Sequence, residues 1–255
     1  MTLNMLHLPL DQRLLFTNAR EHGLARDNGA VDAGYLVHAL FARLFGDLAP
    51  APFALQEVDE RAPSLLSVLA YSPSAHHVLA ERAQGDSFAS TVAWERAGTR
   101  PMPGFAAGQA LSFRVRLCPA IRVGKHHPVL RHGAEVDPYV AHKLRGEGGL
   151  SDQTPDRISV YLEWLRARFG EAASLSACRI AAMRDASLWR KGAPGEGVRV
   201  RARRDFGARQ LLARRELVCE GQLVVQDEAA FASLLARGLG RHRAFGFGML
   251  LLKPA

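Results

Sequence analysis

The sequence predicts an α+β protein with two tandem domains, each an antiparallel sheet with helices on one face. Its 255 residues are enough for two domains of about 120 residues. Strand and helix patterns alternate through the first half, and the second half partly repeats their order. The hydrophobic fraction of 48% is ordinary for a chain that buries a core. We expect the domains to span residues 1–120 and 121–255.

The first half predicts seven elements. Leu3–Leu10 is typical of a strand and residues 11–23 of a helix. Asp32 is a suitable N-cap for an amphipathic helix that runs to about Phe45. "FALQEV" and "SLLSVLAYS" indicate strands, and "SPSAHHVLAERA" indicates a helix capped by Ser72 or Ser74. "GQALSFRVRLCP" alternates as a strand that places Arg114 and Arg116 on one face. This β-α-β-β-α-β order is the split pattern of ferredoxin-like domains.

The second half gives an incomplete version of the same order, without a residue-level repeat. A basic loop at 121–133 carries Arg122, Lys125 and Arg131 and precedes two expected helices, Glu135–Leu144 and Pro155–Phe169. Residues 195–227 then predict a β-hairpin with a basic tip. "DEAAFASLLARGLG", N-capped by Asp227, predicts a helix, and "FGFGMLLLKP" predicts the last strand.

The charge balance favours a polyanionic partner. Lys and Arg total 33 against 25 acids, for a net charge of +8 and a pI near 10.0. Only four of the 33 are lysines, which leaves 29 arginines. Genomic base composition is one explanation for the arginines, and forked contacts to phosphate are the other. The hairpin adds seven arginines against one acid between residues 199 and 215, and its predicted contacts with nucleic acid are Arg199, Arg201, Arg203, Arg204 and Arg209.

Other bulk features indicate a cytoplasmic protein with no membrane partner. No run of about eighteen apolar residues exists, and the N-terminus lacks the basic start of a secretory signal. Cys118, Cys178 and Cys219 are widely separated, which fits neither a disulfide framework nor a metal site. The histidines show no familiar metal-binding spacing, and the pair His126-His127 lies among cations, so we expect no metal and no cofactor.

"GLGRHRAFGFGML", residues 238–250, places glycines around a basic triplet. A dinucleotide-binding turn follows a strand and opens a helix, whereas this turn follows a helix and precedes a strand. A P-loop is excluded because no GxxxxGK[ST] occurs. Two readings remain, a tight turn whose glycines relieve crowding or a close approach for phosphate. The phosphate reading predicts contacts with a phosphodiester backbone at Gly240, Arg241, His242, Arg243, Gly246 and Gly248.

Tyr35 and His38 are three residues apart on the predicted helix, so they share a face and can reach one point. An imidazole can transfer a proton near neutral pH, with a phenol beside it as donor. A partly buried structural histidine is the other reading, and spacing alone does not decide between them.

Three segments together resemble the CRISPR repeat-processing endoribonucleases of the RAMP superfamily, in particular their CasE-like branch. They are "GYLVHALFARLF", "SFRVRLCPA" and the 36 residues "CEGQLVVQDEAAFASLLARGLGRHRAFGFGMLLLKP". The resemblance implies two RAMP-type, RRM-like domains and cleavage of precursor CRISPR RNA without a metal at the base of the repeat hairpin. The 2′-hydroxyl would attack the adjacent phosphate, giving a 2′,3′-cyclic phosphate and a 5′-hydroxyl.

The resemblance also implies roles for particular residues and partners. His38 matches the catalytic imidazole and Tyr35 its partner, while the glycine-rich loop would line the RNA. The mature RNA would be retained for an effector complex with other subunits. About twenty residues separate the first strand from the Tyr35 helix, which departs from the family pattern and leaves Arg20, Arg26 or Arg43 as possible contributors. A non-catalytic CRISPR RNA-binding subunit and a basic DNA-binding regulator are the alternatives.

Overall fold

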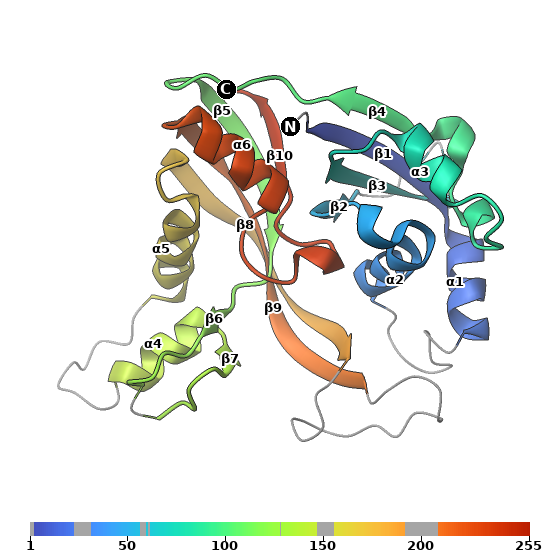
Figure 1. Ribbon diagram of the computed structural model, residues 1–255. Coiled ribbons are helices and arrows are strands. Elements are labelled where there is room, and N and C mark those ends of the chain that lie inside the picture. Colours follow the sequence, from blue (N-terminus) through green and yellow to red (C-terminus); the bar gives the residue numbers. More distant parts are fainter. Residues whose placement is uncertain are drawn as a thin grey trace. The chain divides into compact units, whose positions relative to one another are not determined.

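The computed structural model describes residues 3–22, 32–56, 60, 62–127, 129–146, 156–191 and 209–255 (Figure 1). Contacts divide the chain into two compact units. The first contains Met1–Pro103, Ser187–Ala213 and Arg243–Met249, and the second contains Gly104–Ala186, Arg214–His242 and Leu250–Ala255. The units are therefore discontinuous in sequence and do not coincide with the expected spans 1–120 and 121–255.

The first unit is a four-stranded sheet of order β2-β3-β1-β4, with bounds β1 Asn4–Asp11, β2 Phe53–Leu55, β3 Leu65–Ser72 and β4 Gly98–Pro101. Its pairings are antiparallel, with Leu8 opposite Val68. Leu6, Leu8 and Leu10 alternate toward one face and form the core with the helices α1 Gln12–Glu21, α2 Ala33–Phe45 and α3 His76–Arg82 (Figure 1). Short 3-10 turns follow at Gly46–Leu48, Ala89–Thr91 and Trp94–Arg96.

The second unit repeats the arrangement in the order β10-β5-β9-β8, with bounds β5 Ala110–Leu117, β8 Ala173–Lys191, β9 Arg209–Val225 and β10 Leu250–Pro254. Its helices are α4 Pro138–Gly146, α5 Arg157–Phe169 and α6 Glu228–Arg237. Leu111, Phe113 and Val115 point into its core, where Phe113 contacts Phe169 of α5. A two-stranded ribbon, β6 Ile121–Arg122 with β7 Glu135–Val136, precedes α4.

Both sheets follow one topology, in which the strands of a β-α-β-β-α-β unit lie in the order fourth, first, third, second. The predicted α+β class with antiparallel sheets is therefore confirmed. The placement of the strand around Arg114 in the first domain was wrong. It pairs with β9 and β10, and β4 takes the fourth position in the first sheet. With β5 as its first strand, the second half is a complete unit.

Several local predictions were confirmed and others corrected. Asp32 and Asp227 each accept a backbone N–H at the start of a helix, as predicted, and Asp11 does the same for α1. The predicted cap of α3 was wrong: its N-cap is Ala75, and Ser72 accepts the Ser74 N–H instead. The first helix of the expected pair starts at Pro138, because Glu135 and Val136 pair as β7.

Strand β8 and the three cysteines complete the description of the second unit. Strand β8 was not predicted, although half-buried and exposed residues alternate from Cys178 to Ala182. The three cysteines are free in the structure. Cys118 and Cys219 are buried, and burial raises the pKa of each thiol to about 12. Cys178 is half-buried.

Candidate functional site

Tyr35 and His38 lie in the first two turns of α2, where both side chains are half-buried. The Asp32 carboxylate positions this end of the helix by accepting the N–H groups of Gly34 at 3.0 Å and Tyr35 at 3.3 Å. The same aromatic residue, Phe245, contacts both side chains. Its ring stacks on Tyr35 with centroids 6.2 Å apart and meets His38 edge-to-face at 5.0 Å.

Phe245 belongs to η4, the 3-10 turn Arg243–Phe245 inside the glycine-rich segment. This turn packs on α2 because position 34 is a glycine. A Cβ there would lie 2.9 Å from the Phe245 carbonyl carbon and closer still to its oxygen. The first unit therefore brings together the predicted pair and part of the glycine-rich segment, through two residues, Gly34 and Phe245, that sequence reasoning missed.

Burial lowers the pKa of His38 below its ordinary value of 6.5. Its imidazole is consequently neutral near pH 7, and a neutral imidazole can accept a proton. Chemically, the Tyr35 and His38 face of α2 offers a proton acceptor beside a phenol.

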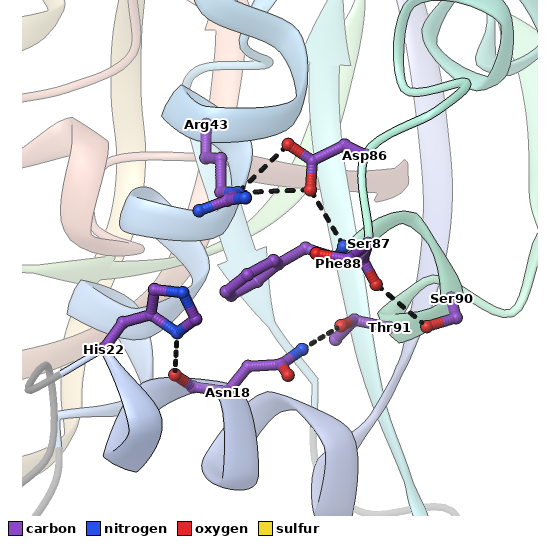
Figure 2. Close-up of polar contacts among 8 residues, drawn as sticks. All are labelled: Asn18, His22, Arg43, Asp86, Ser87, Phe88, Ser90 and Thr91. Carbon is purple, nitrogen blue, oxygen red and sulfur yellow. Dashed lines mark hydrogen bonds and ion pairs between the residues drawn. The ribbon is translucent and has the colours of Figure 1, made fainter.

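Arg43, one of the proposed contributors, lies two turns along α2 in a different cluster (Figure 2). Its Nε donates to both Asp86 carboxylate oxygens, at 3.0 and 3.1 Å, and its guanidinium stacks 3.9 Å from the Phe88 ring centre. Burial would raise the pKa of Asp86, but the Phe88 N–H and Arg43 hold it below its ordinary value. Arg43 and Phe88 line a mainly apolar cavity of about 260 Å³ with His22 and Asn18. Arg43 is thus engaged in structural contacts.

The other two possible contributors are Arg20 and Arg26. Arg20 is exposed near the end of α1. Arg26 lies outside the described residues.

The glycine-rich segment has an unusual backbone. Gly238, Gly240, Gly246 and Gly248 all have positive φ angles, between 72° and 82°. His242 shares this conformation with φ at 59°, which few residues other than glycine adopt. Gly240 faces the Trp164 ring, which a Cβ would approach to 3.3 Å. The four glycines therefore adopt a conformation that suits a tight turn, and Gly240 also avoids crowding against Trp164. Contact of this segment with phosphate stays a prediction.

A single carboxylate, Glu135 of β7, gathers three basic side chains of the second unit. It accepts hydrogen bonds from Arg241 Nε at 2.6 Å, from His242 Nε2 at 2.7 Å and from Arg214 Nη2 at 3.4 Å. The side chains of Glu135 and His242 are only 9% and 7% exposed. The hydrogen bond from His242, with the charges of His242 and Arg241, lowers the pKa of Glu135 to about 2 despite its burial. Sequence reasoning missed Glu135, because its partners lie 79 to 107 residues away.

Five of the remaining predicted RNA contacts lie elsewhere in the second unit. Arg114 pairs with Glu220 at 3.1 Å and Arg116 with Glu216 at 2.7 Å, so the exposed face of β5 is neutralised in part by β9. Arg122, Lys125 and Arg131 are exposed in and after the β6 strand. Arg199, Arg201, Arg203 and Arg204 lie outside the described residues, and for Arg209 only its place in β9 is described.

No group of three or more metal-ligating side chains occurs within the described ranges. In the same part of the chain, no helix has the length and apolar character needed to cross a membrane.

Comparison with known proteins identifies the family. A family model described as "CRISPR associated protein" matches residues 10–254, almost the whole chain. The chain belongs to this family. No match was found among curated proteins.

Solved structures of CRISPR proteins share the fold over the full length. The endoribonuclease Cse3 bound to a 19-nucleotide RNA has 19% identity and a TM-score of 0.61, with 100% of both chains covered. Thermus thermophilus Cse3, bound to an RNA representing a pre-cleavage complex, has 17% identity and a TM-score of 0.60, again with 100% of both chains covered. Cas6e from Escherichia coli K-12 has 16% identity and a TM-score of 0.51, covering 99% of this chain and 100% of that one. The predicted pair of ferredoxin-like domains is thereby confirmed for this CRISPR-associated protein.

Proposed function

We propose that the protein is an endoribonuclease that cleaves precursor CRISPR RNA at the base of the repeat hairpin without a metal. The 2′-hydroxyl of the nucleotide before the cut attacks the adjacent phosphorus, and the bond to the 5′-oxygen breaks. The products are a 2′,3′-cyclic phosphate and a 5′-hydroxyl. The cleaved RNA then stays bound for assembly with other subunits of an effector complex.

The observation that carries the proposal is the face of α2 bearing Tyr35 and His38, one turn apart and both against Phe245. In this mechanism the neutral imidazole of His38 takes the proton of the 2′-hydroxyl, and water supplies the proton that the leaving 5′-oxygen gains. The Tyr35 hydroxyl donates a hydrogen bond to the phosphate oxygens or the leaving oxygen. A positioned acid or base contributes about 10²–10⁴-fold to the rate.

Arginines supply the remaining stabilisation by pairing with the negative charge of the pentacovalent phosphorane. A paired RNA stem offers shape and phosphates rather than readable base edges, so basic side chains are suitable readers. We assign this binding to Arg241 and Arg243 of the glycine-rich segment, to Arg122, Lys125 and Arg131, and to the arginines of the hairpin. The likeness in fold to Cse3 structures containing RNA supports the same assignment.

The decisive experiment uses a cognate repeat hairpin in excess chelator under single-turnover conditions. We expect cleavage of the all-ribose substrate and none of a substrate with a 2′-deoxy nucleotide at the scissile position. Cleavage of the deoxy substrate would exclude attack by the 2′-hydroxyl, and cleavage that needs added metal would exclude the metal-free route.

A second candidate is a non-catalytic subunit that holds a CRISPR RNA end in an assembly. The likeness of the protein to a chain of a CRISPR RNA-guided surveillance complex (pre-nicking) favours this candidate. The alignment covers 100% of both chains, at 16% identity and a TM-score of 0.51. This candidate predicts tight, salt-sensitive binding with both substrates recovered intact.

A further inference from the structure

The Glu135 cluster presents an acid where an RNA-binding surface is expected to be basic. Its members come from three separate elements of the second unit: Glu135 from β7, Arg214 from β9, and Arg241 and His242 from the turn after α6. The proposed function assigns Arg241 to phosphate, while the structure shows it already bonded to a carboxylate. Any role for Glu135 must account for the proposed contact of Arg241 with phosphate and for its observed bond to the carboxylate.

Geometry distinguishes the two ends of the Arg241 side chain. Glu135 engages Nε at 2.6 Å, and among the described residues no hydrogen bond is made by the terminal nitrogens. The side chain is 38% exposed, in contrast with the nearly buried carboxylate. The terminal nitrogens are the fork that binds two phosphate oxygens at once. Glu135 therefore holds the guanidinium from its inner edge and leaves the fork available.

His242 supports the same reading. Its side chain is too buried to contact an RNA directly, and its backbone adopts a left-handed conformation that costs free energy for a non-glycine residue. The 2.7 Å hydrogen bond to Glu135 stabilises that conformation directly beside Arg241.

We propose that Glu135 is a positioning residue for RNA binding: by bonding Arg241 Nε and His242 Nε2, it sets the turn and aims the Arg241 fork at a phosphodiester. This inference rests on the proposed function. It also reverses the simple electrostatic expectation, in which removal of a negative charge near an RNA strengthens binding.

The test combines RNA affinity with hydrogen exchange of the RNA-free protein. In Glu135→Gln, we expect the affinity for a repeat hairpin to fall about tenfold although the net charge rises. Amide exchange in residues 238–249 should become faster. Glu163→Gln, an exposed acid on α5 of the same unit, is the charge-matched control and should leave both readouts unchanged.

A second variant guards against a folding defect at position 135. Arg241→Lys keeps the charge and leaves Glu135 intact, but removes Nε and the fork, so its affinity should also fall about tenfold. Tighter RNA binding by Glu135→Gln, unchanged exchange in that variant, or wild-type affinity in Arg241→Lys would each overturn the proposal. If the wild-type protein binds no hairpin RNA, the proposed function fails, whereas the exchange result still decides whether Glu135 sets the turn.

Discussion

The substitution Gly34→Ala tests how the candidate site is assembled, because two effects of opposite sign compete there. Alanine is favoured over glycine within a helix by up to about 1 kcal/mol. The new Cβ would, however, lie 2.9 Å from the Phe245 carbonyl carbon, whereas ordinary contact begins at 3.4 Å. Helix α2 and the Arg243–Phe245 turn must then separate by at least about 0.5 Å, which forfeits a quarter or more of each affected dispersion contact.

We expect the contact to dominate, since overpacking costs about 1–3 kcal/mol. Gly34→Ala should therefore unfold at a lower urea concentration, and RNA cleavage should slow more than RNA binding weakens, because Phe245 would no longer pack on Tyr35 and His38. Gly98→Ala is the matched control: a Cβ at position 98 meets nothing within 4 Å. A Gly34→Ala protein that is as stable as the wild type and cleaves at the wild-type rate would refute this reasoning.

Three further outcomes follow from described contacts. Burial lowers the pKa of His38, so its proton-accepting form persists below pH 6.5; single-turnover cleavage should decline only below that pH, and the residual rate of His38→Ala should lack the decline. Gly221→Ala should destabilise the protein by about 1–3 kcal/mol in urea unfolding, because a Cβ would lie 2.9 Å from Cys178 Cα; an unchanged midpoint contradicts this. Asp227→Ala should cost about 1 kcal/mol, since its carboxylate caps α6 at 2.7 Å, and an unaltered Tm would argue against the cap.

Local signals in the sequence predicted most elements but not the assignment of one strand to its sheet. The alternation at 110–117 predicted a strand with one apolar face, and Leu111, Phe113 and Val115 are indeed buried. Its partners β9 and β10 lie about a hundred or more residues later, and strand pairing leaves no mark in a single strand's own pattern. Moving this one strand completes the second ferredoxin-like unit.

The same division between local and distant signals holds for the candidate site. Tyr35 and His38 could be paired from sequence because residues three apart share a helix face. Phe245 and Glu135 could not, because each reaches its partners across a long span of chain. The basic triplet was found from composition, but composition could not show that Arg241 and His242 bind a buried carboxylate. The contact of Arg241 with RNA stays a prediction, as do the catalytic roles of Tyr35 and His38, whereas the His242 side chain is too buried for such a contact.

The central claim is that this face of α2 carries the cleavage chemistry. The most direct test is mass spectrometry of the RNA ends after incubation with a cognate repeat hairpin in excess chelator, for the wild type and for Tyr35→Phe combined with His38→Ala. We predict a 2′,3′-cyclic phosphate and a 5′-hydroxyl from the wild type, and intact RNA that still binds with the double variant. Intact RNA from the wild type, or the same products at the same rate from the double variant, would contradict the claim.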